Sequence, residues 1–328
     1  MTTNRRITLA HTPTEQLAAT DFASDETASP ELNDGEFLVD VKYVSVDPTI
    51  RGWVAYDTYL PKIPEGDVIR AGGAGEIIES RNPKYPVGTR VSGMTGWQSR
   101  AALDGGFVIP DGVEYTDALS VFGATGLTAY VGMLNIGKPT AGETVVVSGA
   151  AGAVGSLAGQ IAKIQGANVI GLAGSDEKCA WVTDELGFDQ CLNYRDGHIA
   201  RQLHQACPKG IDVYFDNVGG EILNAVLGQI RDHARIVMCG AISNYDGKEL
   251  QPGPANIVNV VPRRALMQGF IVLDHFDQAR EASQAFGEWI MSGKIKSRVD
   301  VTQGLENAPA ALLGLFTGEN IGKSLVAV

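Results

Sequence analysis

Between residues 120 and 296, short apolar runs alternate with segments of helical pattern, and this alternation constrains the fold more than any other feature of the chain. TVVVSG and NVIGLAG are apolar almost throughout, and a helical stretch follows each of them. Strands this apolar are buried on both faces, as in a parallel sheet that helices cover on each side. Six strands with right-handed crossovers predict a Rossmann-type, doubly wound α/β sheet. Its later elements include helices over residues 176–187 and 221–232 and a last strand over 267–273.

The segment before this region has a different pattern. FLVDVKYVSVDP alternates apolar and polar residues and stops at Pro48, and glycines mark the corners of AGGAGEIIES. We therefore expect a compact, barrel-like β domain over residues 1–119, followed by the Rossmann domain over 120–296. The tail, 297–328, reads strand, helix, strand, and we expect it to return to the first domain.

Composition excludes some classes of partner. The chain has 328 residues and a formal net charge of -12, with 44% hydrophobic and 20% charged residues, which is ordinary for a globular enzyme. A net negative charge argues against a nucleic-acid or anionic-membrane partner, although a local basic pocket remains compatible with it. The start shows no apolar leader segment, and no run of about 18 apolar residues occurs, so we expect a cytoplasmic protein without a membrane span.

The cysteines and histidines give little support to a metal site. The four cysteines, Cys179, Cys191, Cys207 and Cys239, contain no C-x-x-C pair, and we expect buried or half-buried free thiols. His198 and His204 share a predicted helix but are six residues apart, so they do not lie on one face.

A glycine-rich turn follows the first strand of the alternating region. Gly149, Gly152 and Gly155 form the pattern G-x-x-G-x-x-G, a variant of the dinucleotide-binding fingerprint. Glycine permits a tight turn and lets a pyrophosphate approach backbone N–H groups, and the helix N-terminus favours its negative charge. The alternative is a turn with no ligand, but the position between a buried strand and a helix favours binding.

The end of the next strand lacks an acid. An NAD enzyme usually has Asp or Glu there, bonded to the ribose 2′-hydroxyl. This chain has Gly174 and Ser175, with Lys178 one turn into the helix, so we predict that these residues accept a 2′-phosphate and select NADPH. A charged hydrogen bond is worth about 1.5–3 kcal/mol, roughly a tenfold to hundredfold preference. The alternative for Lys178 is a solvated helix lysine.

Several segments together resemble one family. GAAGAVGS, GSDEK, NYR, DVYFDNVGGE and ARIVMCGAISNYDG resemble zinc-independent medium-chain dehydrogenase/reductases, in the group of leukotriene dehydrogenase/prostaglandin reductase and of the alkenal double-bond reductases. VDPTIRG, FGATGLTAY and FTGENIGKSLV extend the resemblance over most of the chain. It implies a GroES-like β-barrel domain, a Rossmann domain, an active crevice between them, NADPH, and a homodimer joined through MQGFIVL. Zinc-dependent relatives have a G-H-E segment where this chain has AGGAGE, and no cysteine precedes Cys179, so we expect no metal.

The resemblance also implies roles for individual residues. The pyrophosphate would contact the glycine turn, Lys178 and Tyr194 would contact the 2′-phosphate side, and Asn217 would lie beside the ribose. For Asn217 a simple turn residue is the alternative, and for residues 270–272 a core strand. The implied cofactor-binding residues are Gly152, Ala153, Val154, Gly155, Ser175, Lys178, Tyr194, Asn217, Cys239, Gly240, Ala241, Ile242, Ser243, Tyr245, Phe270, Ile271, Val272 and, from the tail, Asn320.

Reduction of an enal or enone needs an orienting site and a donor to the developing oxygen. Tyr245 is the candidate, because a phenol with an ordinary pKa near 10 is a neutral donor at pH 7. The alternative is an exposed loop aromatic, and the α-carbon proton could come from Tyr245 or from water. Trp53, Tyr56 and Tyr59 are candidates to line the substrate pocket, or else are ordinary aromatics of their loop. A quinone reductase and a non-catalytic NADPH-binding protein remain alternative functions.

Overall fold

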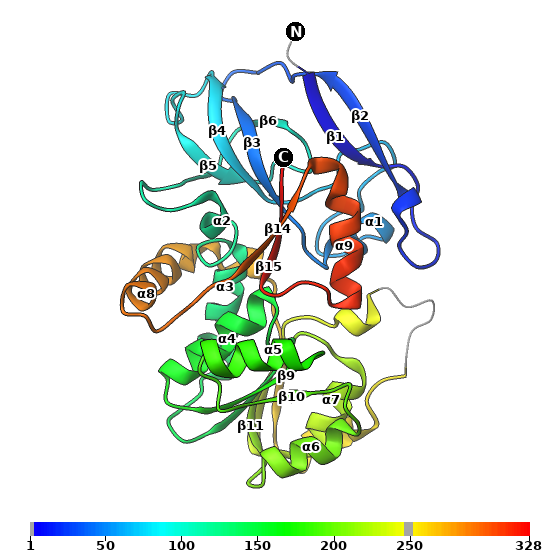
Figure 1. Ribbon diagram of the computed structural model, residues 1–328, viewed down its shortest axis with the longest axis vertical. Coiled ribbons are helices and arrows are strands. Elements are labelled where there is room, and N and C mark those ends of the chain that lie inside the picture. Colours follow the sequence, from blue (N-terminus) through cyan, green and yellow to red (C-terminus); the bar gives the residue numbers. More distant parts are fainter. Residues whose placement is uncertain (1–2, 246–251) are drawn as a thin grey trace. The chain divides into compact units, whose positions relative to one another are not determined.

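The computed structural model describes residues 3–245 and 252–328 (Figure 1). Contacts divide the chain into two units: Met1–Ser120 with Val299–Val328, and Val121–Arg298. Within the described residues, no helix combines the length and apolar character that crossing a membrane requires.

The second unit is built on a parallel sheet of six strands in the order β10-β9-β8-β11-β12-β13. In chain order this is the 3-2-1-4-5-6 arrangement of a Rossmann fold, so the predicted fold class is confirmed. The carboxyl ends of β9, β8, β11 and β12 are neighbours, so the loops that follow these strands share one edge. The strands are β8 (Thr144–Ser148), β9 (Asn168–Ala173), β10 (Gln190–Asn193), β11 (Ile211–Asp216), β12 (Ile230–Met238) and β13 (Leu266–Gly269).

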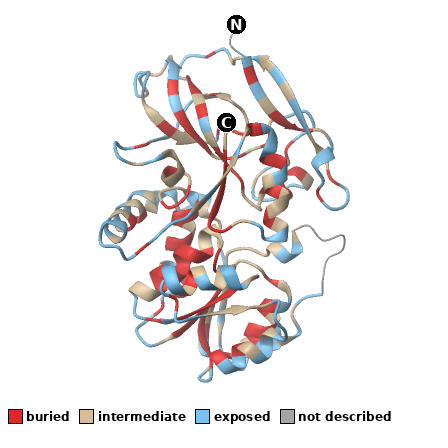
Figure 2. Ribbon diagram, viewed as in Figure 1, coloured by how far each residue is buried: buried red, intermediate tan, exposed pale blue. Residues whose placement is uncertain are grey.

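Helices cover both faces of this sheet. Val145 and Val147 of β8 pack in one core cluster with α3, α4 and α8, whereas Val146 packs in another with α6 and α7. Successive strand side chains thus point to opposite layers, as the apolar strands require. Figure 2 shows the strands β8, β9 and β11 as mostly buried. The helices are α3 (Ala124–Val131), α4 (Ala153–Ile164), α5 (Asp176–Ala180), α6 (Ile199–Ala206), α7 (Gly220–Leu227) and α8 (Ala279–Met291), with 3₁₀ or π turns at Gly132–Gly137, Trp181–Glu185, Ile242–Asn244, Ala255–Val260 and Val272–Gln278.

Three predicted elements end elsewhere in the structure. The helix predicted over 176–187 is α5 followed by a π turn, and the helix predicted over 221–232 stops at Leu227. Ile230 is already strand, because it pairs with Ile211 of β11. The last strand ends at Gly269 rather than at 273. The early end of the second helix thus arises from strand pairing, which a local pattern does not contain.

The first unit is an antiparallel β structure with one parallel pair. Its larger sheet has the order β14-β15-β3-β4-β5-β7, with β6 also pairing with β3, and β1 and β2 form a separate pair. The strands are β1 (Thr3–Leu9), β2 (Phe22–Ala28), β3 (Phe37–Ser45), β4 (Gly73–Ser80), β5 (Arg90–Gly93), β6 (Arg100–Leu103), β7 (Phe107–Val108), β14 (Val299–Gln303) and β15 (Lys323–Ala327), and the helices are α1 (Ile50–Ala55), α2 (Tyr115–Ala118) and α9 (Ala308–Thr317), with 3₁₀ turns at Ala19–Asp21 and Leu305–Asn307.

A buried lysine fastens the tail to this unit. β15 pairs antiparallel with β3, and Lys323 on β15 is only 2% exposed. Its Nζ donates to the Val46 carbonyl at 2.8 Å, to Asp47 Oδ1 at 2.9 Å and to the Ser324 carbonyl at 3.0 Å. The GKSLV and VDPTIRG segments are therefore joined through one ammonium group.

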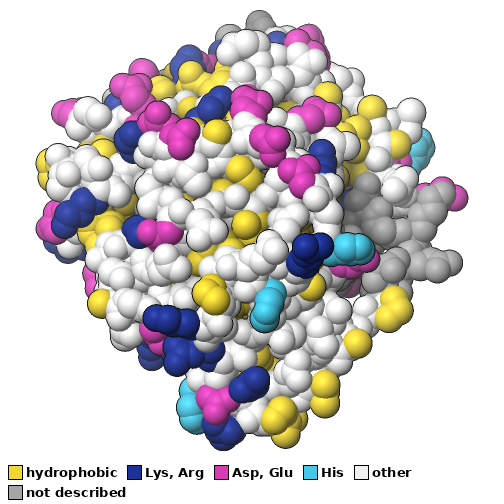
Figure 3. Space-filling view, turned by 60° about the horizontal axis from the view of Figure 1, so that its bottom comes forward, with side chains coloured by type: hydrophobic (Ala, Val, Ile, Leu, Met, Phe, Trp, Pro, Cys, Tyr) yellow, Lys and Arg dark blue, Asp and Glu magenta, His cyan; other side chains and the backbone are white. Residues whose placement is uncertain are grey.

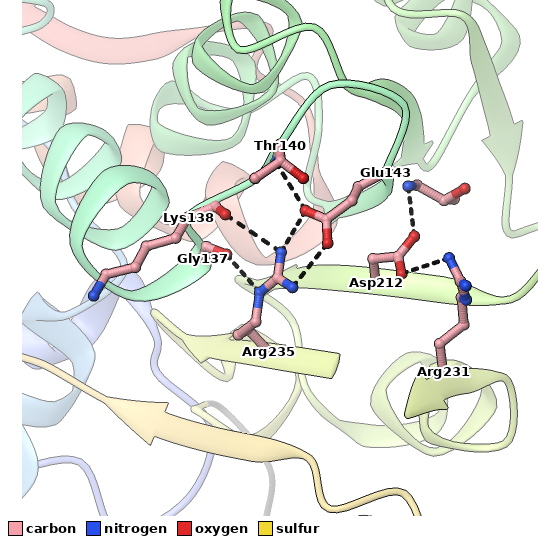
Figure 4. Close-up of polar contacts among 8 residues, drawn as sticks. Gly137, Lys138, Thr140, Glu143, Asp212, Arg231 and Arg235 are labelled. Atoms are coloured by element: carbon pink, nitrogen blue, oxygen red, sulfur yellow. Dashed lines mark hydrogen bonds and ion pairs between the residues drawn. The ribbon is translucent and has the colours of Figure 1, made fainter. Parts of the chain in front are cut away.

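Ion pairs stabilise the amino ends of the strands in the parallel sheet of the second unit. This end of the sheet lies opposite the loops that follow β8, β9, β11 and β12. Arg235 of β12 donates to both carboxylate oxygens of Glu143, at 2.9 and 2.6 Å, and to the Gly137 carbonyl at 2.9 Å (Figure 4). Asp212 accepts from the Thr144 amide at 2.9 Å and from Arg231 at 2.9 Å. Both carboxylates lie beside the first residues of β8 and β11, where they fix the strand entrances.

Candidate functional site

The glycine turn after β8 is as tight as the sequence pattern requires. Gly149 has a φ of +60°, and a Cβ placed on Gly155 would lie 2.2 Å from the Gly149 carbonyl oxygen. A Cβ on Gly152 would lie 3.1 Å from the same oxygen. A side chain is therefore excluded at Gly155 and crowded at Gly152, so the backbone is accessible where the chain turns into α4.

The N-terminus of α4 directly follows this turn. Gly152 is the residue before the first helical turn, and Ala153, Val154 and Gly155 supply that turn's N–H groups. Amides in the first turn have no partner within a helix, and the helix dipole adds positive potential. Ala153 and Val154 are only half-buried, so this twelve-residue helix presents an anion-binding end at the sheet edge.

The end of β9 is shaped by Tyr194. A Cβ on Gly174 would lie 2.6 Å from the Tyr194 hydroxyl, so the phenol lies directly over the glycine. Ser175 caps α5, and its Oγ accepts from the Lys178 amide at 3.3 Å. Ser175, Lys178 and Tyr194, three residues predicted to contact a 2′-phosphate, are thus brought together.

The acidic residues of α5 do not disturb this arrangement. Asp176 Oδ1 accepts from Asn193 Nδ2 at 2.9 Å, which directs that carboxylate toward β10. Glu177 is exposed. Both occupy the first helical turn, where negative charge is favoured.

Asp216, at the end of β11, is a functional residue that the sequence reasoning missed. It is fully buried, and its Oδ1 accepts from Ser148 Oγ at 3.0 Å, Tyr214 hydroxyl at 2.7 Å, and the Val218 and Gly219 amides at 2.9 and 2.8 Å. Its backbone carbonyl accepts from the Cys239 and Gly240 amides. One residue therefore joins the ends of β8, β11 and β12. The sequence contained one signal for this role, which is the presence of a charged residue, Asp216, at the end of an otherwise apolar strand.

Burial governs the ionisation of this carboxyl group. Desolvation raises the pKa of Asp216 above its ordinary value, although the hydrogen bonds to Oδ1 oppose that shift. Burial likewise raises the pKa of the Tyr214 phenol. Through these hydrogen bonds the network positions the loops that follow β8, β11 and β12.

Asn217 connects the loops on either side of it. Its amide donates to Ser148 Oγ at 2.9 Å and its Nδ2 to the Ser148 carbonyl at 2.7 Å. Its own carbonyl accepts from the Ile242 amide at 3.3 Å. Asn217 is therefore more than a turn residue, because it holds the loop after β12 against the glycine turn.

The loop Cys239–Tyr245 folds back on itself. Ser243 Oγ donates to the Val218 carbonyl at 2.6 Å, and the Ala241 amide donates to the Tyr245 hydroxyl oxygen at 3.2 Å. A phenol that accepts one bond still carries its own O–H donor. Tyr245 is half-buried, and Asp246 and Gly247 of the SNYDG segment lie outside the described residues.

Residues 270–272 lie just beyond β13. Phe270 and Val272 pack against the core cluster that contains α3, and a Cβ on Gly132 would lie 2.9 Å from Phe270 Cζ. Ile271 is half-buried. Phe270 and Val272 therefore have a packing role whether or not they also contact a cofactor.

The remaining candidates belong to the first unit. Trp53 is only 9% exposed and packs edge-on against Tyr59, with ring centroids 6.2 Å apart. Tyr56 and Tyr59 are 55% and 46% exposed, and the Tyr59 hydroxyl is 3.1 Å from Thr49 Oγ1. Asn320 Nδ2 donates to the Gly322 carbonyl at 2.8 Å. The exposed tyrosines are available to a ligand, whereas Trp53 supports them from the core.

Charged side chains and possible metal ligands were also located in the structure. On the face that Figure 3 shows, Asp and Glu side chains are most frequent in the upper half, and Lys and Arg side chains occur in both halves. Among residues 3–245 and 252–328, no group of three or more His, Cys, Asp or Glu side chains could hold a metal ion.

Comparisons with known proteins follow the same division of the chain. A family model described as the N-terminal domain of oxidoreductase matches residues 5–110, and one described as zinc-binding dehydrogenase matches 153–288. The NADPH-dependent curcumin reductase of Escherichia coli is 39% identical, covering 99% of this chain and 97% of its own. Prostaglandin reductase 1 of Mus musculus is 42% identical over 93% of each chain.

The chain is also similar to solved structures of oxidoreductases. CurA from Vibrio vulnificus, solved in complex with NADPH, superposes with a TM-score of 0.95 at 39% identity and covers 99% of both chains. The Escherichia coli quinone oxidoreductase with NADPH has a TM-score of 0.81 at 21% identity, over 99% of this chain and 100% of its own, which shows a shared fold alone.

Proposed function

Because this chain belongs to the medium-chain dehydrogenase/reductase family, as an NADPH-dependent oxidoreductase, we propose that it reduces the carbon–carbon double bond of α,β-unsaturated aldehydes and ketones. The relatives named for curcumin and prostaglandin reduction support this substrate class, since curcumin is a conjugated enone. The structural observation that supports NADPH as the cofactor is the arrangement at the end of β9, formed by Gly174, Ser175, Lys178 and Tyr194.

The residues at the sheet edge fit NADPH. Gly152 to Gly155 would hold the pyrophosphate, since the turn has no room for a Cβ at Gly155 and α4 presents its amides there. Ser175, Lys178 and Tyr194 would hold the 2′-phosphate, and Asn217 the ribose. We propose cofactor contacts also for the loop Cys239–Tyr245, for residues 270–272 and for Asn320. When bound, NADPH supplies a hydride for the β-carbon of the conjugated double bond.

The protein must then stabilise the oxygen of the substrate as negative charge develops on it. Tyr245 is the proposed donor, because its phenol is neutral at ordinary pH and its position is fixed by the Ala241 amide. The α-carbon takes its proton from Tyr245 or from water. Both routes use the same donor to the oxygen.

The first unit is the proposed substrate unit. Tyr56 and Tyr59 would contact the apolar part of the substrate, with Trp53 supporting Tyr59 from the core. The corresponding domain limits are 1–119, 120–296 and 297–328.

The proposal is tested by NADPH consumption against a panel of alkenals, enones and quinones, with products identified by mass spectrometry. We expect turnover of enals and enones with a product that has gained two hydrogens at the carbon–carbon double bond. Turnover of quinones alone would replace this function by quinone reduction. Tight NADPH binding without turnover of any member would indicate a non-catalytic protein.

We also propose a homodimer formed through β13. This strand lies at the edge of its sheet, and Leu266 on it is 48% exposed. Val258 and Val261, which precede it, are 64% and 78% exposed. An exposed apolar edge is a favourable surface for pairing with a second copy. Light scattering should give twice the chain mass, and Leu266→Asp with Val261→Asp should give a monomer. A monomeric wild-type chain would contradict the proposal.

A further inference from the structure

Two of the four cysteines lie against each other at the contact between α5 and β10. Asn193 Nδ2 of β10 donates to Asp176 Oδ1 of α5 at 2.9 Å. Cys179 is three residues after Asp176 and shares its helix face, and Cys191 is two residues before Asn193 and shares its strand face. Both cysteines pack against one core cluster and line one surface hollow, so the two thiols lie close together beside the Asp–Asn bond.

Both sulfurs can be reached from solvent. Cys179 and Cys191 are half-buried and line one surface hollow of about 410 Å³. Its other walls are mostly polar: Asp176, Gln190, Leu192, Asn193, Asp196, Gln202, Gln205 and Ala206. A small polar reagent therefore has access to the hollow that both cysteines line, whereas Cys207 is buried and neither Cys207 nor Cys239 lines this hollow.

The two thiols differ in reactivity. The hydrogen bond from Cys191 lowers the pKa of Cys179, despite partial burial, and the same bond raises the pKa of Cys191. Thiolate character favours reaction at the sulfur with the lower pKa, so we take Cys179 as the nucleophile and Cys191 as the resolving thiol.

We propose that Cys179 and Cys191 form a reversible oxidation site, which a hydroperoxide converts into an intramolecular disulfide. The Cys179 thiolate attacks the peroxide, an S–O bond forms, the O–O bond breaks, and water or an alcohol leaves after protonation. Cys191 then attacks the sulfenic acid sulfur, the S–S bond forms, and water leaves. The two thiols lose two electrons and two protons, and the peroxide gains them.

Oxidation would alter the proposed cofactor site, and this consequence rests on the proposed function. A disulfide requires an S–S bond of about 2.0 Å, so α5 and β10 must draw closer than two hydrogen-bonded thiols allow. Lys178 is the neighbour of Cys179, and the Ser175 cap begins the same five-residue helix. The movement displaces both phosphate contacts, and NADPH affinity falls.

The covalent step is tested on the full chain with hydrogen peroxide as the probe. Thiol titration of the unfolded protein should fall from four groups to two, and peptide mass spectrometry should find Cys179 linked to Cys191. In Cys191→Ala, dimedone should label Cys179, because the sulfenic acid has no resolving thiol. Linkage of any other pair, or no loss of thiols, overturns the proposal.

The consequence is tested by the dissociation constant of NADPH, measured by fluorescence before and after peroxide. We expect a rise of about tenfold, the lower end of what a charged phosphate contact contributes, and reversal by dithiothreitol. The double variant Cys179→Ser, Cys191→Ser is the control, because it keeps Cys207 and Cys239. Its dissociation constant for NADPH should not change after peroxide treatment. An unchanged constant in a chain with the disulfide overturns the coupling to the cofactor. Absence of NADPH binding in the reduced chain would instead contradict the proposed function, with the disulfide result still standing.

Discussion

At the scale of single residues, we expect Lys178 to determine which nicotinamide cofactor the chain prefers. The side chain would pair with the 2′-phosphate, a group that NADH lacks. Lys178→Ala should therefore raise the Michaelis constant for NADPH about tenfold to hundredfold and leave that for NADH nearly unchanged, which steady-state kinetics with each cofactor can measure. Lys209→Ala removes an exposed lysine elsewhere in the same unit and serves as the control. An equal effect on both cofactors would remove the phosphate role.

Tyr245 is the proposed donor to the developing oxygen of the substrate. Tyr245→Phe removes only the hydroxyl group, and loss of one donor to a developing oxyanion lowers turnover by about ten- to a thousandfold. Single-turnover NADPH oxidation with an enone isolates the chemical step. Tyr43→Phe, in the first unit, is the matched control. A chemical step as fast as that of the wild type would exclude Tyr245 as the donor.

The candidate site could be predicted from the sequence only where its parts are local. The three glycines of the turn, Gly149, Gly152 and Gly155, are close together in the sequence. Their spacing alone therefore predicts an anion site lined by backbone. Asp216 could not be assigned this way, because its bond to Ser148 joins residues far apart in the chain. Its role depends on β8 and β11 being neighbours, which is a property of the sheet.

At the scale of elements, the alternation of strands and helices predicted the parallel sheet, but not every boundary. Helical spacing continues past Leu227, yet the chain leaves the helix at Gly228 and enters β12 at Ile230. Pairing with β11 outweighs local propensity there, since a buried strand gains a full set of backbone hydrogen bonds.

The entrance to β8 is held by Glu143, whose contribution depends on pH. Burial tends to raise the pKa of Glu143, but the bonds from Arg235 and Thr140 outweigh it and lower the pKa below the ordinary 4.5. The Glu143 carboxylate therefore stabilises the fold at pH values above its ordinary, unfolded-state pKa. This contribution to stability is lost as the pH falls through the lower pKa of the folded state. Glu143→Gln should cost about 1–3 kcal/mol at neutral pH and progressively less in acid.

Urea unfolding of the wild type and Glu143→Gln at several pH values measures this difference. Glu185→Gln is the control, because Glu185 is fully exposed and pairs with Lys296 at the surface, so its midpoint should not change. A difference that grows in acid would show that the sign is wrong.

At the scale of the whole molecule, the chain leaves the β unit at Ser120 and returns to it at Val299, so the first and last segments must find each other after the Rossmann unit has been synthesised. Lys323 is the polar contact that fixes this return, since its ammonium group is buried against Val46, Asp47 and Ser324. A buried ammonium group is tolerated only where such partners surround it.

Lys323→Met should lower the free energy of unfolding by about 3 kcal/mol, the lower end of the cost of breaking a buried pair, because Asp47 keeps some contact with water. Lys42→Met provides the control, since Lys42 and Asp40 form a more exposed pair, worth about 1 kcal/mol or less. Adding Asp47→Asn to Lys323→Met should recover part of the loss, because the unpaired carboxylate is then gone. Denaturant unfolding of the three variants and the wild type measures these values, and equal losses for Lys323→Met and Lys42→Met would mean that the tail is held by its strand pairing and apolar packing alone.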